Sequence, residues 1–165
     1  MTYILAAQRD GSPAEMIANF ERYQAFLEGS RSRFPPGAHA LATSDWYYNP
    51  KDHRCPHDAW LEDAMIRESA IGEARAQRSV ALEVRLLGAY HDGHISFRYP
   101  QVFAYRLDAW DSAQGHRDWR YDEFRLSDTG HVLHEIEWAG PGATSRWLVE
   151  ASDVQMTWEP SPGSG

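Results

Sequence analysis

The sequence predicts an α+β fold: a mainly antiparallel β-sheet of hairpins, arranged as a sandwich or half-barrel, with one N-terminal helix packed on it. Three observations support this. Over residues 79–158 apolar and polar side chains alternate with a period of two, turn-forming residues separate the alternating runs, and one capped helical pattern precedes them. A chain of 165 residues has the usual size of one domain. We expect a single domain over 1–159 and a flexible tail over 160–165.

The helix is expected at about residues 13–28. Ser12 is suited to cap its N-terminus, Pro13 suits the first helical position, and Glu15 can complete a capping box. Gly29 then offers a left-handed end. Between these signals apolar residues recur every three or four positions, which predicts a helix that hides one face of the sheet. The stripe consists of Met16, Ile17, Phe20, Tyr23 and Leu27.

The next segment, 30–56, is expected to be irregular. It carries Pro35-Pro36-Gly37, Asn49-Pro50 and Cys55-Pro56, which interrupt regular structure, and it leaves room for only a short strand near 40–46. Residues 57–69 fit a helix or a strand, and the residue pattern alone leaves both open. The β-rich region is therefore taken to extend over 57–158.

From residue 79 onward the chain reads as strands and turns. Val80, Leu82, Val84 and Leu86 share one face of a half-buried strand, and Asp92-Gly93 predicts a tight hairpin to a strand over 95–99. Pro100 ends that strand and another follows over 102–107. Two more hairpins are expected, 119–126 with 132–138 and 146–151 with 154–158. The register of the middle hairpin stays open, because a shift by one residue exchanges its faces.

Charge and cysteine content narrow the function classes. The chain has 24 acidic and 16 basic side chains, a net charge of -8, which repels nucleic acids and anionic membranes and favours a basic protein partner. Cys55 is the only cysteine, so no intrachain disulfide forms. The N-terminal residues do not resemble a signal peptide, and no run of about 18 apolar residues occurs. We expect a cytoplasmic protein without a cofactor.

The densest polar cluster, 52–58, predicts a metal site as one alternative. Zinc is bound by imidazole, thiolate and carboxylate groups, and the cluster supplies all three types. A second ligand pair would have to come from elsewhere, such as His91 and His94. In the competing interpretation the cluster is a polar loop in which Asp58 caps free backbone N–H groups. The candidate ligands of a metal-dependent enzyme are His53, Cys55, His57 and Asp58.

Glu135 and Glu137 point to the same face of a predicted strand. Two carboxylates so placed can act as acid and base in glycoside hydrolysis. We favour a solvent-facing stripe instead, opposite the inward-pointing Ile136 and Trp138, with His134 as a hydrogen-bonded core histidine. Because no nucleophile elbow, Walker loop, dinucleotide fingerprint or metalloprotease motif occurs, we assign no catalytic residue.

Aromatic residues gather in or beside the predicted loops. Trp46, Tyr47, Tyr48, Trp110 and Trp119 can anchor a partner, border a pocket for a small ligand, or fill the ends of the sheet. A deep apolar pocket beside them would favour ligand binding, whereas a convex surface would oppose it.

Three segments follow one another along the chain: His57-Asp58-Ala59-Trp60-Leu61, the strand 82–90 and the stretch 99–107. Their order resembles that in a bacterial β-rich family grouped with immunity proteins of polymorphic toxin systems. The resemblance covers about 57–158. It implies that residues 57–66 form a strand and that the protein binds and blocks a toxin without catalysis.

The leading hypothesis is therefore a non-catalytic protein-binding module, an immunity-type inhibitor whose acidic surface meets a basic toxin. The alternatives are the metal-dependent enzyme and a small-ligand binder that uses the aromatic loops. Acidic side chains would engage basic partner groups through charged hydrogen bonds. The candidate contact residues are Trp46, Tyr48, Asp118, Trp119, Asp122, Glu123, Glu135 and Glu137.

Overall fold

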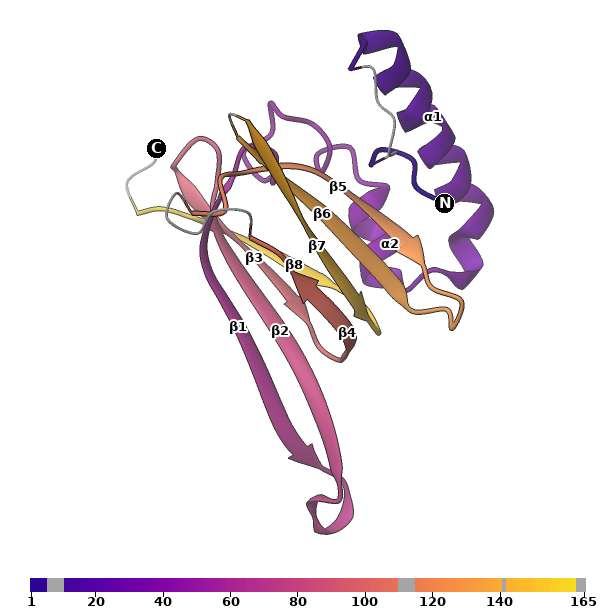
Figure 1. Ribbon diagram of the computed structural model, residues 1–165, viewed down its shortest axis with the longest axis vertical. Helices are drawn as coiled ribbons and strands as arrows, with labels where there is room; N and C mark the ends of the chain where they lie inside the picture. Colours follow the sequence, from indigo (N-terminus) through magenta and orange to yellow (C-terminus); the bar gives the residue numbers. More distant parts are fainter. Residues whose placement is uncertain (6–10, 110–114, 141, 163–165) are drawn as a thin grey trace.

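The computed structural model describes residues 1–5, 11–109, 115–140 and 142–162, and Figure 1 shows how their helices and strands are arranged. The α+β prediction is confirmed: an open antiparallel sheet is accompanied by an N-terminal helix and a second, short one. The helices are α1 (Pro13–Ser30) and α2 (Pro36–Ala42). The strands are β1 (Trp60–Ile71), β2 (Gln77–Leu87), β3 (Gly93–Tyr99), β4 (Val102–Leu107), β5 (Asp118–Leu126), β6 (Val132–Gly140), β7 (Ala143–Ala151) and β8 (Gln155–Pro160).

The sheet consists of two halves that meet at a single residue pair. The strand order is β4-β7-β6-β5-β1-β2-β3-β8, and β5 is joined to β1 only where Asp118 lies opposite Trp60. The halves face each other across the core, as shown by Phe97 of β3, whose ring stacks on Trp119 of β5 at 5.1 Å. The arrangement is sandwich-like. Large side chains fill its core, because the chain is rich in aromatic residues. Its largest buried side chains include Trp119, Trp138, Trp147, Phe97, Phe124 and Tyr99.

Helix α1 begins as predicted, because the Ser12 side chain accepts a hydrogen bond from the Glu15 N–H at 3.2 Å. It contacts the sheet at the open edge of β5. There the Tyr23 hydroxyl accepts from the Phe124 N–H (2.8 Å) and donates to the Phe124 carbonyl (3.1 Å). The helix therefore satisfies an exposed strand edge, a common way to protect a sheet from unwanted pairing.

The segment predicted to be irregular contains α2, so the short strand expected near 40–46 is wrong. The N-terminus of α2 is held by Asp153, whose carboxylate accepts the N–H groups of Gly37 and Ala38, each at 2.9 Å. An acidic group at this end also complements the helix dipole. The carboxylate lies more than a hundred residues away in the chain, so no local pattern could reveal it.

The first two predicted hairpins form, and in the middle one Glu123 lies opposite Glu135. The turn of the first was predicted at Asp92-Gly93 but lies at 88–91, where His91 donates its N–H to the Gly88 carbonyl and has a positive φ, whereas Gly93 already belongs to β3. The third hairpin is wrong: β7 pairs with β6 and β4, whereas β8 crosses to pair with β3. Between β7 and β8, Asp153 binds α2 and Val154 enters the core, which directs the chain to the other half of the sheet.

Residues 57–69 were compatible with a helix or a strand, and most of them lie in the strand β1. Together β1 and β2 make a long hairpin arm that projects from the sheet (Figure 1). We call β1 and the part of β2 before Leu82 the arm, since β2 pairs with β3 only from Leu82 onward. β8 continues to Pro160, and Ser161 donates its N–H to the Asp92 carbonyl at 2.7 Å, so residues 160 and 161 are held by backbone hydrogen bonds. Residues 163–165 lie outside the described part. None of the described helices is long and apolar enough to cross a membrane.

Candidate functional site

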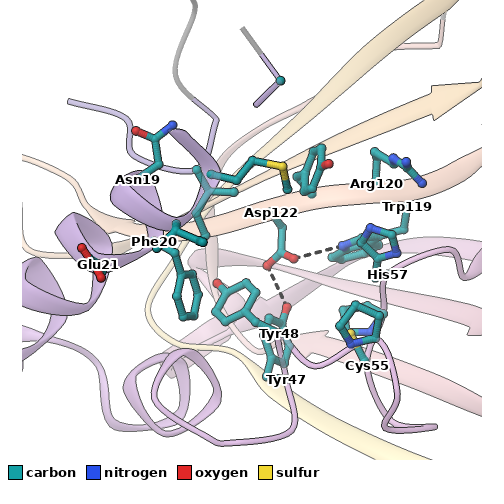
Figure 2. Close-up of a pocket in the computed structure, with 17 residues that line it drawn as sticks. Asn19, Phe20, Glu21, Tyr47, Tyr48, Cys55, His57, Trp119, Arg120 and Asp122 are labelled. Carbon is teal, nitrogen blue, oxygen red and sulfur yellow. Dashed lines mark hydrogen bonds between the residues drawn. The ribbon is translucent and has the colours of Figure 1, made fainter. Parts of the chain in front are cut away.

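A pocket of about 650 Å³ opens between α1, the loop over 47–57 and the start of β5 (Figure 2). Its first wall is the N-terminal half of α1. The apolar stripe of this helix divides: Tyr23 and Leu27 are buried against the sheet, whereas Ile17 stays 60% exposed and lines the pocket together with Met16 and Phe20. The first half of the stripe thus faces a hollow that the fold leaves open.

The opposite wall is aromatic. Tyr47 and Tyr48 come from the loop and Trp119 is the second residue of β5, and all three were expected to lie in or beside loops. Tyr48 packs edge-to-face against Phe20, at a ring distance of 5.6 Å. Its hydroxyl donates to Tyr23 at 3.3 Å. The pocket is therefore held between a helix and a loop that contact each other directly.

Asp122 forms the polar floor and is 3% exposed. Its Oδ1 accepts from the Trp119 indole N–H at 3.1 Å, and its Oδ2 accepts from the Tyr47 hydroxyl at 2.9 Å (Figure 2). Burial, and after it the Asp122 charge, raises the pKa of Tyr47 well above its usual value, so the phenol keeps the proton that it donates.

The network continues behind the floor through His134, whose Nε2 lies 2.9 Å from Asp122 Oδ2. Its Nδ1 lies 2.7 Å from the Tyr99 hydroxyl. Burial raises the pKa of Tyr99, which therefore stays a phenol and can donate to Nδ1. In that arrangement the histidine proton sits on Nε2, facing the carboxylate. The expectation of a hydrogen-bonded core histidine is confirmed.

Cys55, His57 and Arg120 line the remaining side (Figure 2). Burial raises the pKa of the Cys55 thiol to about 12, so it is neutral near pH 7 and is not an activated nucleophile. His57 Nδ1 lies 3.2 Å from Asp58 Oδ1 without a hydrogen bond between them, and Asp58 Oδ1 accepts from Arg120 at 2.9 Å. Asp58 itself has a positive φ of 64° where the chain turns into β1.

The candidate metal ligands do not converge. The His53 ring stacks on Tyr90 at 4.1 Å and its Nδ1 pairs with Asp92, away from the pocket that holds Cys55 and His57. His94 lies beside Glu62, at 3.4 Å. Within the described ranges no group of three or more His, Cys, Asp or Glu side chains is placed to hold a metal ion. Asp58 is engaged by Arg120.

The structure corrects the solvent-facing stripe. Glu137 is 4% exposed and Glu123 is fully buried. The N-terminal segment covers this face, because Tyr3 and Leu5 donate their N–H groups to Glu123 at 2.9 and 3.1 Å. Arg146 reaches Glu137 at 3.1 Å. This cover comes from the opposite end of the sequence, so local alternation could not reveal it.

The other predicted contact residues have different surroundings. Glu135 is largely covered and pairs with Arg125 and Arg146. Asp118 is half-buried, and Trp46 lies beneath the Arg54 guanidinium at 4.6 Å. With Asp122, Glu123 and Glu137 inside the fold, these acidic side chains cannot meet a partner as expected. Trp110 lies outside the described residues.

Sequence reasoning missed the role of Met16, Ile17 and Phe20, because an apolar stripe is normally a packing face. The side chains of α1 and of the aromatic loop that are buried are not the ones that a regular apolar pattern predicts. Comparisons with protein-family models, with curated proteins and with solved structures found no match. The resemblance to immunity proteins therefore stays a prediction.

Proposed function

We propose that this protein binds a small, mainly apolar molecule in the pocket between α1 and β5. The observation that carries the proposal is the hollow of about 650 Å³ with apolar walls and one buried carboxylate at its floor. Ligand pockets commonly measure about 300–1,000 Å³ and combine apolar walls with few, well-positioned polar groups. The pocket has both properties.

The side chains indicate the chemistry of the ligand. Phe20 and Tyr48, which line the pocket and are partly exposed, offer ring faces and edges to an aromatic group, and such contacts are worth about 0.5–1.5 kcal/mol beyond apolar burial. A carboxylate oxygen has two lone pairs and can accept two hydrogen bonds. Among the described hydrogen bonds Asp122 Oδ1 accepts one, from the Trp119 N–H, so it can accept another. A ligand N–H or O–H is the complementary group. We therefore infer an aromatic molecule with one hydrogen-bond donor.

The test uses N-phenyl-1-naphthylamine, a neutral aromatic fluorophore with one N–H. We expect saturable binding at one molecule per chain, and Ile17→Trp to weaken it severalfold because the larger ring takes up part of the pocket. Ile17 is already 60% exposed, so the substitution should leave the fold intact. The readout is a fluorescence titration, with thermal unfolding as a check on folding.

The matched control is Tyr105→Trp, which also enlarges an exposed side chain but lies outside the pocket. It should bind the fluorophore like the parent protein. Absence of saturable binding by the parent, or equal binding by Ile17→Trp, would contradict the proposal.

A second candidate is the protein-binding module, in the form of an immunity-type inhibitor of a basic toxin. The projecting arm favours protein binding because its residues from Glu62 onward are exposed along β1. The net charge of -8 predicts that a purified toxin encoded beside this chain binds with an affinity that falls as salt rises. Titrations at low salt and at about 0.5 M NaCl check this, and an unchanged affinity would argue against it.

A further inference from the structure

The free edge of β1 is a long strand edge. From Leu61 to Ile71 its described partner is β2 on one side, and on the other side only Trp60 is paired, with Asp118 of β5. Strand edges are commonly protected by proline, by bulges or by charged side chains, lysine above all. The stretch 61–71 has no proline or lysine and its register shifts only between Leu61 and Asp63, but it carries four charged side chains that a pairing strand would have to match. The edge thus presents backbone N–H and C=O groups that can pair with another strand.

Apolar side chains accompany this edge. Met65 and Ile66 are 43% and 44% exposed and point to opposite faces of the strand. Ile66 and Ala64 lie on the face of Leu82 and Val84, which belong to the core, because these residues are paired across β1 and β2. A strand added to the edge would place its own side chains beside Ala64 and Ile66 and so extend this apolar face.

Charges along the edge identify the strand that fits. Asp63 and Arg67 form no ion pair within the described part of the chain, and the Arg67 guanidinium donates to the Met65 sulfur at 3.2 Å. By contrast, Glu62 is paired with Arg85 at 3.3 Å, and Glu68 with Arg78 at 3.5 Å. One acidic and one basic side chain, Asp63 and Arg67, therefore remain without an ion-pair partner among the described residues. They lie symmetrically about Met65 in the sequence of β1.

We propose that β1 of a second copy of this chain pairs antiparallel with this edge, about a two-fold axis at Met65. Antiparallel pairing then places Asp63 opposite Arg67 twice and Ala64 opposite Ile66 twice. Met65 lies opposite its own symmetry mate. Glu62 falls opposite Glu68, but the arginines already paired with these carboxylates reduce their repulsion.

Neighbouring registers fit less well. An axis at Arg67 or at Glu68 brings identical charges face to face, which is unfavourable in a strand pair. An axis at Ile66 leaves Asp63 opposite Ser69, without a charged partner. The Met65 register is the one in which the two unpaired charges of β1 neutralise each other. It joins the arms of two molecules into one continuous sheet.

Disulfide cross-linking tests the register. Met65→Cys should form a covalent dimer under mild oxidation, because both copies of residue 65 face each other. Ser69→Cys, on the same face of the strand, is the matched control: its two copies would be about 27 Å apart. The parent protein should not cross-link, since Cys55 is buried. Equal cross-linking at 65 and 69, or none at 65, would overturn the proposal.

Charge exchange tests the pairing. Sedimentation should show a concentration-dependent dimer that Arg67→Asp weakens at least tenfold, and Asp63→Lys combined with Arg67→Asp should restore it. Unchanged thermal unfolding shows that each variant remains folded. A parent protein that stays monomeric, or a double variant that is not restored, would overturn self-pairing. Ligand binding in the pocket does not depend on either outcome, so the two proposals fail separately.

Discussion

Asp122→Ala is expected to lower the free energy of unfolding by about 4 kcal/mol. The substitution removes the acceptor for the Tyr47 hydroxyl, the Trp119 indole and the His134 ring, all within the core. Leaving a buried donor without an acceptor costs roughly 1–3 kcal/mol. Three such donors share one carboxylate, and relaxation of the site offsets part of the sum. Urea unfolding followed by tryptophan fluorescence measures the loss.

Asp118→Ala provides the control for this prediction. Asp118 lies on the same strand and is half-buried, without the three donors that surround Asp122. Its replacement should change the free energy of unfolding by less than about 1 kcal/mol. Similar losses in both variants would show that the network around Asp122 adds nothing beyond ordinary strand effects.

The network also connects the pocket to the stability of the fold. Asp122 accepts hydrogen bonds from groups on both sides, Tyr47 and Trp119 at the pocket and His134 in the core. A variant of Asp122 would therefore disturb ligand binding and folding together. Ile17, exposed on α1, changes the pocket without touching this network, so it is the informative position for the binding test.

Local signals predicted much of the fold. The Ser12 cap and the alternation from Val80 to Leu86 act within a few residues, and each produced the expected element. The first hairpin also forms, although its turn lies before Asp92-Gly93, with the positive φ at His91. His134 also behaved as predicted, because strand alternation decides which face a residue occupies. The mainly antiparallel architecture follows from the sum of such short-range preferences.

Features set by distant contacts could not be predicted. Asp153 captures the start of α2, and Leu5 helps to cover Glu123, although both pairs are separated by more than a hundred residues. The pocket also depends on distant contacts. In the sequence the apolar stripe on α1 looks like a packing face along its whole length, but in the fold the sheet leaves the first half of the stripe uncovered. Charge drew attention to Asp122 and a position beside a loop drew attention to Trp119, but both were assigned to a partner-binding surface.

Tyr23→Phe is expected to destabilise the fold by about 3 kcal/mol, although only one oxygen atom is removed. The Tyr23 hydroxyl is both acceptor for the Phe124 N–H and donor to the Phe124 carbonyl. These backbone groups belong to the open edge of β5 and are enclosed by α1. Burial raises the pKa of Tyr23 far above its usual value, so the donor proton is retained throughout the working pH range. Urea unfolding checks the magnitude.

Tyr48→Phe is the matched control, since its hydroxyl donates only to Tyr23 among the described hydrogen bonds, at 3.3 Å. We expect a loss below about 1 kcal/mol, the usual net value of one hydrogen bond. Amide hydrogen exchange adds a local readout: the Phe124 N–H should lose protection in Tyr23→Phe and keep it in Tyr48→Phe. If both variants retain this protection, α1 shields the β5 edge by apolar packing, and the hydroxyl is not what completes its hydrogen bonding.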